Sequence, residues 1–183
     1  DGKEEKKISP LGITPEEDTE PAAYDLDQIR QAGELIAATL SGPDTYYEYK
    51  GRGFGLQFEM AESFASTIGA RLRMETARDT AELFRRLKQG EIDLIALEIP
   101  EGLIQDASLR SSGAWSPGTD SIREDRLSWV VREDSPFLAE ALDGWYKPET
   151  RTFLQDRNRQ RLAPGGGVRR RVRAPFQNRA KGI

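Results

Sequence analysis

The chain has 183 residues, enough for one domain with extensions, and it combines 37% hydrophobic residues with 32% charged residues. It contains no cysteine and no histidine, which excludes disulfides, thiolate nucleophiles, the usual zinc sites and histidine-based triads. No apolar run reaches the roughly 20 residues that span a bilayer. No signal peptide is recognisable, so we expect a cytosolic or an already processed chain.

Charge is distributed unevenly along the chain, although the formal net charge is only −4. Nine of the 27 basic residues lie from Arg157 onward, where there is no acidic residue, so residues 1–156 carry 18 basic against 31 acidic residues. This asymmetry predicts a basic tail that is a solvated linker or that packs on anions, including the acidic body. A nucleic-acid-binding protein would carry a basic folded face with interleaved aromatic residues, so no nucleic-acid partner is expected.

The first part of the chain predicts a leader, a short helix and a buried strand. Residues 1–23 are polar, charged and proline-bearing, which is typical of a disordered leader. Residues 25–32 predict a short helix that Gly33 ends. The continuous apolar run at 34–40 predicts a strand covered on both faces, and residues 41–53 then read as turn and hairpin.

A longer helix is predicted directly after the glycine-rich turn that ends at Gly55. Its apolar residues recur at four-residue spacing on one stripe, and Gly69 ends it; the stripe is Leu56, Met60, Phe64 and Ile68. Residues 71–77 alternate between apolar and charged side chains, which predicts a strand near a sheet edge.

The next helix is expected to begin at Asp79 as its N-cap and to run through Gln89, with Glu82 completing a capping box. Residues 92–99 predict a second buried strand, so the order is β-α-β-α-β with parallel crossovers.

The last part of the chain contains fewer regular elements. Between Pro100 and Asp125 the apolar residues are too scattered to predict any. Residues 126–133 predict one more strand, a helix starts at Ser135-Pro136, and residues 148–161 predict another helix.

Few motifs in the sequence carry chemistry. The helical pair Glu62-Ser63 lacks the proline and the glycine-rich stretch that follow the catalytic acid in soluble lytic transglycosylases, so a catalytic role is not expected there. Gly51, Gly53 and Gly55 do not have dinucleotide-binding spacing and are interpreted as turn residues. No cofactor and no metal site is predicted.

Three segments, in this order, resemble type 2 periplasmic solute-binding proteins. The stretch GLQFEMAESFASTIGARL is similar to the family's first helix, DTAELFRRLKQGEIDLIAL to its second segment, and RLSWVVREDSPFLAEALDGWY to the strand and helix that return to the first lobe. Within this family, the resemblance extends to the solute-binding-like domain that precedes the catalytic domain of membrane-bound lytic murein transglycosylases. The residues that match are Gly55, Glu59, Ala61, Phe64, Ala65, Gly69, Leu83, Leu87, Gly90 and Asp93.

The resemblance implies an α/β fold, a single lobe of the type 2 periplasmic-binding-protein fold. It implies a mostly parallel sheet with one antiparallel strand and helices on both faces. About 25 residues between Pro100 and Asp125 are too few for a second lobe with its own core. We therefore expect a leader at 1–23, one lobe at 24–161 that cannot close as a clamshell, and a basic linker at 162–183 towards a catalytic domain.

The same resemblance implies a non-catalytic regulatory or targeting module of a cell-envelope lytic murein transglycosylase. Its partners would be the downstream catalytic domain and a peptidoglycan fragment, a small polar ligand or another envelope protein. It would reside in the periplasm or cell envelope and reach the membrane only through a lipid anchor. Where amino-acid-binding members carry an arginine for the ligand carboxylate, this chain has Glu98 and Glu101 and no arginine, which disfavours free amino acids.

The rim at the carboxyl ends of the strands is where open α/β sheets bind ligands. Glu98 at this rim would favour a cationic or amine group. The candidate ligand-binding residues are Ser41, Thr45, Tyr46, Arg78 and Glu98.

Three other functions remain open. The chain could be a stand-alone periplasmic protein that binds a small ligand. It could be a glycan-cleaving enzyme that uses a carboxylate pair such as Glu59 and Glu98, or a metal held by carboxylate oxygens. It could also be a scaffold whose Arg169–Arg173 segment docks on an acidic partner, or a lobe that self-associates through its open face.

Overall fold

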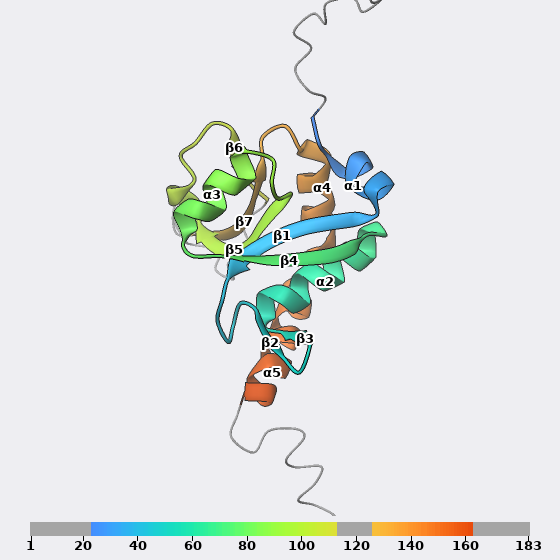
Figure 1. The fold of residues 1–183 in the computed structure, drawn as a ribbon, viewed down its shortest axis with the longest axis vertical. Coiled ribbons are helices and arrows are strands. Elements are labelled where there is room, and N and C mark those ends of the chain that lie inside the picture. Colours follow the sequence, from blue (N-terminus) through green and yellow to red (C-terminus); the bar gives the residue numbers. More distant parts are fainter. Residues whose placement is uncertain (1–22, 113–125, 163–183) are drawn as a thin grey trace, which may run out of the picture.

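The computed structural model of the protein describes residues 23–112 and 126–162. Five strands form one sheet in the order β4-β1-β5-β7-β6, and β2 and β3 form a separate hairpin (Figure 1). The elements, in chain order, are α1 (Leu26–Ala32), β1 (Glu34–Leu40), β2 (Tyr47–Tyr49), β3 (Arg52–Phe54), α2 (Leu56–Ile68), β4 (Arg71–Ala77), α3 (Thr80–Lys88), β5 (Leu94–Pro100), the 3₁₀ turn η1 (Glu101–Leu103), β6 (Leu109–Ser111), β7 (Leu127–Arg132), α4 (Pro136–Trp145) and α5 (Pro148–Leu162).

Strand β7 is the one strand of the described sheet that runs against the others. β1 pairs in parallel with β4 along its whole length and with β5, whereas β7 pairs antiparallel with both β5 and β6. The predicted α/β class, with a mostly parallel sheet and one antiparallel strand, is therefore confirmed. The predicted strand at 71–77 is indeed an edge strand, because β4 ends the sheet.

Helices cover both faces of the sheet, as expected for strands that are apolar along their length. Leu35 and Ala37 of β1 pack with α1, α2 and α4, while Ala38, on the opposite face, packs with Leu83 and Leu87 of α3. Figure 1 shows α2 and α3 on opposite sides of the sheet. The alternation of β1 thus divides the core into two clusters, one on each face.

The larger cluster is built around α2 and an aromatic stack. The predicted stripe of α2 is fully buried, and Gly69 ends the helix in the left-handed conformation. Trp145 stacks on Phe64 at 5.5 Å and on Trp129 at 6.0 Å between ring centroids. Trp129 also donates a hydrogen bond of 2.7 Å from its indole nitrogen to the Gln57 side chain, so the indole N–H is satisfied inside the core.

Asp25 caps two helices that lie far apart in the sequence. Its carboxylate accepts hydrogen bonds from the backbone of Leu26, at the start of α1, and from Phe137 and Leu138, at the start of α4. The cap residue of α4, Ser135, makes no side-chain cap of its own, because its hydroxyl donates to the carbonyl of Tyr24. A single buried carboxylate therefore satisfies amide groups of both helix ends.

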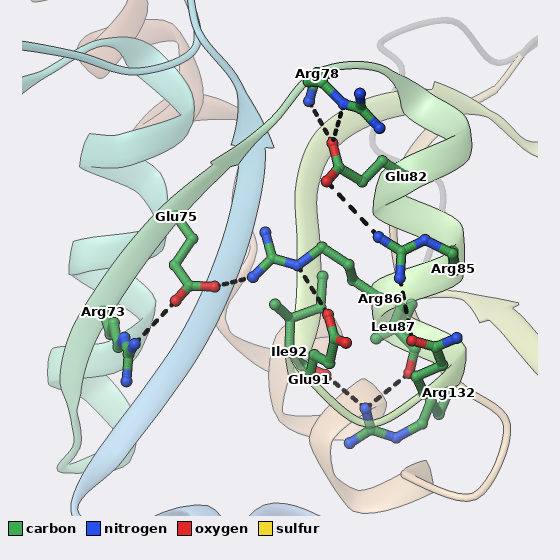
Figure 2. Close-up of polar contacts among 11 residues, drawn as sticks. Arg73, Glu75, Arg78, Glu82, Arg85, Arg86, Leu87, Glu91, Ile92 and Arg132 are labelled. Atoms are coloured by element: carbon green, nitrogen blue, oxygen red, sulfur yellow. Dashed lines mark hydrogen bonds and ion pairs between the residues drawn. The ribbon is translucent and has the colours of Figure 1, made fainter.

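Asp93 and Arg132 join the start of β5 to the end of β7. The Asp93 carboxylate accepts from the backbone of Ile36 at 2.8 Å and lies 3.9 Å from the Arg132 guanidinium. Arg132 donates to the carbonyls of Leu87 and Ile92, as Figure 2 shows. Burial raises the pKa of the Asp93 carboxyl, while the Ile36 amide and the Arg132 charge lower it.

Three details differ from the sequence prediction. Asp79 does cap α3, but the Glu82 side chain accepts from the backbone of Arg78, so the predicted capping box is only half formed. Strand β5 begins at Leu94, two residues later than predicted. Strand β6 was not predicted, because a three-residue strand shows no periodicity and is defined by its pairing with β7.

The predicted leader and most of the predicted basic linker lie outside the described residues, so these domain boundaries stay predictions. The basic tail begins inside α5, where Arg157 and Arg161 pair with Glu59 of the acidic body. Within residues 23–112 and 126–162, no helix combines the length and the apolar character needed to span a bilayer.

We predict that Asp25→Ala lowers the free energy of unfolding by about 1–4 kcal/mol, because one capping interaction is worth about 0.5–2 kcal/mol and two helices lose theirs. Urea denaturation measures this loss. The matched control is Asp27→Ala, which removes an exposed carboxylate from the same helix turn and should change stability by less than about 1 kcal/mol. Equal effects of the two substitutions would contradict the double-capping role.

Candidate functional site

A pocket of about 320 Å³ opens where the carboxyl ends of β1 and β5 meet helix α5. The loop after β1, the first turn of α2, strand β5 and one face of α5 all contribute to it. This is the rim at which open α/β sheets bind ligands. The lining residues are Asp44, Thr45, Leu56, Gln57, Leu97, Glu98, Arg151, Gln155 and Arg159.

The amino terminus of α2 borders this pocket but offers no free anion site. The backbone amides of Leu56 and Gln57 donate to the carbonyl of Asp44, and the amide of Phe58 donates to the carbonyl of Thr45. These are the groups that would otherwise attract an anion at a helix start. The carbonyls of the loop after β1 accept from these amides instead, so a ligand in the pocket would be recognised by side chains.

Glu98 and Arg151 form the central ion pair of the pocket. The Nε and Nη2 atoms of Arg151 donate to the two carboxylate oxygens of Glu98 at 2.6 and 2.8 Å, a bidentate arrangement. The two side chains are only 16% and 19% exposed. The hydrogen bond to Glu98 raises the pKa of Arg151, although burial opposes the shift. Glu98 is thus fully engaged by a residue 53 positions away.

Helix α5 also forms ion pairs with a second carboxylate, that of Glu59 on α2. Arg157 lies 3.3 Å from its Oε1 atom, and Arg161 forms a close ion pair with that same oxygen. The Glu59 side chain is 7% exposed. An adjoining hollow of about 450 Å³ is lined by these three residues, by Arg52 and by part of the hairpin and of α2.

The structure brings two of the five predicted site residues into one pocket. Thr45 and Glu98 both line it, with the Thr45 hydroxyl donating to the carbonyl of Leu40. Ser41, Tyr46 and Arg78 lie outside the lining. Ligand binding at each of the five residues stays a prediction.

The three outlying residues have other partners. Ser41 forms an isolated β-bridge with Tyr46 through the backbone. The Tyr46 hydroxyl donates a hydrogen bond of 2.7 Å to the Glu48 carboxylate. Burial and this hydrogen bond raise the pKa of Tyr46 to about 12. Arg78 is 87% exposed and pairs with Glu82 at the start of α3, as Figure 2 shows.

The residues that sequence reasoning missed come from α5. Arg151, Gln155 and Arg159 follow one another at four-residue spacing, so they share one face of the helix. This spacing is visible in the sequence, but it does not reveal which surface the face meets. Within the described residues, no group of three or more histidine, cysteine, aspartate or glutamate side chains is placed to hold a metal ion.

Solved structures with a similar fold are domains of periplasmic amino-acid-binding proteins. The arginine-bound form of domain 1 of TmArgBP matches with a TM-score of 0.54 at 20% identity, over 64% of this chain and 94% of that one. An ancestral amino acid-binding protein, a precursor of cyclohexadienyl dehydratase, matches with a TM-score of 0.58 at 12% identity, over 73% of this chain and 96% of that one. The fold is therefore that of a type 2 periplasmic-binding-protein domain.

Two named proteins are similar to this chain in amino-acid sequence. A protein of Vibrio cholerae is 40% identical over 115 residues, which are 63% of this chain and 22% of that protein. One of Aeromonas hydrophila is 39% identical over 74 residues, or 40% of this chain and 15% of that protein. Both are named membrane-bound lytic murein transglycosylase F. The chain thus spans about a fifth or less of these relatives, and no protein-family model matches it.

We predict that Gly55→Ala distorts the pocket and lowers the free energy of unfolding by more than about 2 kcal/mol. Gly55 has a φ of 113°, and a β-carbon there would collide with the carbonyl of Thr45, a lining residue. The matched control is Gly90→Ala, because Gly90 has a φ of 77° with open space around it. Backbone strain alone should lower the free energy of unfolding of the Gly90 variant by about 1–2 kcal/mol, as measured by thermal unfolding. A Gly55 variant as stable as the Gly90 variant would refute the steric argument.

Proposed function

We propose that this chain is a non-catalytic, solute-binding-like module with a regulatory or targeting role in a cell-envelope lytic murein transglycosylase. The names of the relatives support the transglycosylase context. The fold supports the binding role, because it is shared with domains of amino-acid-binding proteins. The catalytic function belongs, in this proposal, to another part of the full-length protein.

The observation that carries the non-catalytic role is the ion pairing of both candidate carboxylates. A glycoside-cleaving carboxylic acid must hold a proton that it can give to the glycosidic oxygen. Glu98 instead accepts two hydrogen bonds from Arg151, and Glu59 accepts from Arg161 and lies against Arg157. Because a carboxylate so engaged acts as an acceptor, neither residue is arranged as a general acid.

The ligand that suits the pocket is small and polar and carries a positive charge. The volume of about 320 Å³ is near the lower end for small-molecule sites. Gln57, Gln155 and Thr45 offer neutral polar groups, while Glu98 offers a carboxylate to a cation that replaces Arg151 on it. A peptidoglycan fragment with a free amino group has this chemistry, as does a small guanidinium compound.

The cellular setting follows from the same proposal. The module would lie in the periplasm or cell envelope, with the predicted leader, residues 1–23, as a polar tether behind a lipid anchor. The predicted linker, residues 162–183, would then connect it to a catalytic domain. The name membrane-bound, given to the relatives, supports the envelope location.

We predict that residues 1–183 bind purified peptidoglycan without cleaving it. Incubation with sacculi should release no more soluble muropeptides than buffer does, as measured by chromatography, while a muramidase serves as the positive control. Co-sedimentation with the sacculi measures binding in the same samples. Release of muropeptides that disappears in Glu98→Gln or Glu59→Gln would overturn the proposal and establish the carboxylate-based enzyme instead.

A further inference from the structure

Helix α5 is held to the body mainly by polar contacts. It has 15 residues, yet among residues 148–161 only Leu154 and Asn158 are buried. Figure 1 shows it below the sheet, beside the hairpin β2–β3. Its polar attachments include the pair with Glu98, the two pairs with Glu59, and a hydrogen bond from Asn158 to the carbonyl of Pro43, while Leu154 packs into the larger core cluster. A helix with so little apolar surface gains little from burial.

The contact surface of α5 also contains buried polar atoms that have no hydrogen-bond partner. These are the Oε2 atom of Glu59, the Nε atom of Arg157 and the Oδ1 atom of Asn158. Each such atom costs stability, because it has left water without gaining a replacement. These atoms lower the stability of the docked position of α5, and the two hydrogen bonds between Arg151 and Glu98 are its ion pair to the sheet.

Arg151 occupies the place in the pocket that a ligand cation would take. Its guanidinium donates one hydrogen bond to each oxygen of Glu98, the carboxylate that β5 contributes to the pocket lining, while the loop residue Asp44 contributes another. Gln155 and Arg159, on the same face of α5, form the remaining wall on that side. The chain thus supplies from its own last described helix the chemical group that the pocket is suited to bind.

We propose that Glu98 is the anchor of a binding subsite for guanidinium or primary ammonium groups, and that Arg151 is its built-in competitor. A small cationic ligand exchanges with the Arg151 guanidinium on Glu98, and this exchange removes the main tie between α5 and the sheet. This inference rests on the proposed function for the ligand-binding role of the pocket. It adds the chemical class of the ligand and the element that responds to it.

The exchange has a direct physical consequence for affinity and for α5. The ligand and Arg151 compete for one carboxylate. The apparent association constant is therefore the intrinsic association constant multiplied by the fraction of molecules in which Glu98 is free of Arg151. Ligand binding correspondingly lowers the population in which α5 is docked. Whatever follows α5 in the chain then receives a ligand-dependent change in position.

Binding by isothermal titration calorimetry tests the competition, with the full 183-residue chain and three probes of similar shape. Agmatine presents a guanidinium without a carboxylate, L-arginine presents both groups, and L-citrulline replaces the guanidinium by a neutral urea. Agmatine should bind, and L-arginine should bind more weakly because its carboxylate is disfavoured near Glu98. L-citrulline should bind at least about tenfold more weakly than L-arginine, since it lacks the charge-assisted pair. Glu98→Gln should weaken agmatine binding by about tenfold or more.

Arg151→Ala is the decisive variant, and Arg157→Ala is its matched control. Removing Arg151 frees Glu98, so agmatine should bind about tenfold more tightly. Removing Arg157 loosens α5 at Glu59 but leaves Glu98 occupied, so affinity should change by less than about threefold. Arg151→Gln repeats the test with a side chain that keeps much of the length, and circular dichroism checks the fold of each variant.

Several outcomes would overturn this inference. Weaker or unchanged agmatine binding in both Arg151 variants would show that Arg151 is no competitor. Equal gains in the Arg151 and Arg157 variants would show that loosening α5, and not freeing Glu98, controls the site. If no cationic probe binds to any variant, the ligand class is wrong. The proposed function is tested separately by the peptidoglycan incubation, so its failure is distinguishable.

The response of α5 can be measured because the chain has no cysteine. Ser66→Cys on α2 and Gln160→Cys on α5, both at exposed positions, accept a pair of spin labels without background labelling. Agmatine should broaden or lengthen the distance distribution between the labels, and L-citrulline should leave it unchanged. The Arg151→Ala background should show the altered distribution without any ligand. An unchanged distribution at saturating agmatine would refute the release of α5.

Discussion

The two hydrogen bonds between Arg151 and Glu98 are the interaction that joins helix α5 to the sheet at the pocket. They join a helix that has little apolar surface to a strand that is buried in the core. The low exposure of both side chains strengthens this pair relative to the ion pairs on the surface of α3. Glu98 belongs to the sheet and Arg151 to the helix, so this pair ties the α5 wall of the pocket directly to the sheet.

The covering of the pocket by α5 gives a single lobe a second wall. In a two-lobed binding protein, the second lobe closes over the ligand and excludes water from it. Here the loop after β1, the start of α2 and the strand β5 form one side, and α5 forms the other with Arg151, Gln155 and Arg159. The wall is a short element that is tied by charge, so its displacement requires much less buried surface to be exposed than the opening of a domain interface does.

The order of elements could be predicted from the sequence, whereas the pairing of distant side chains could not. Local chemistry determines the helix ends: Asp25 and Asp79 cap, and Gly33 and Gly69 terminate in the left-handed conformation. Strand β6 escaped prediction because three residues cannot show alternation. The role of Arg151 escaped because its partner lies 53 residues earlier. The position of Glu98 at the rim could be expected, since a carboxylate near the end of a buried strand reaches that edge of the sheet, and its role in ligand binding stays a prediction.

The reversed direction of β7 brings the two ends of one connection together. Pro100 at the end of β5 pairs with Leu127 at the start of β7, and the amide of Glu101 donates to the carbonyl of Arg126 at 2.8 Å. The end of β5 and the start of β7 are therefore held together by backbone hydrogen bonds, with β6 lying between them in the sequence. The entropy of closing such a loop grows only slowly with its length. Evolution could splice an entire additional unit into this junction, or excise one, and leave every strand pairing of the remaining lobe untouched.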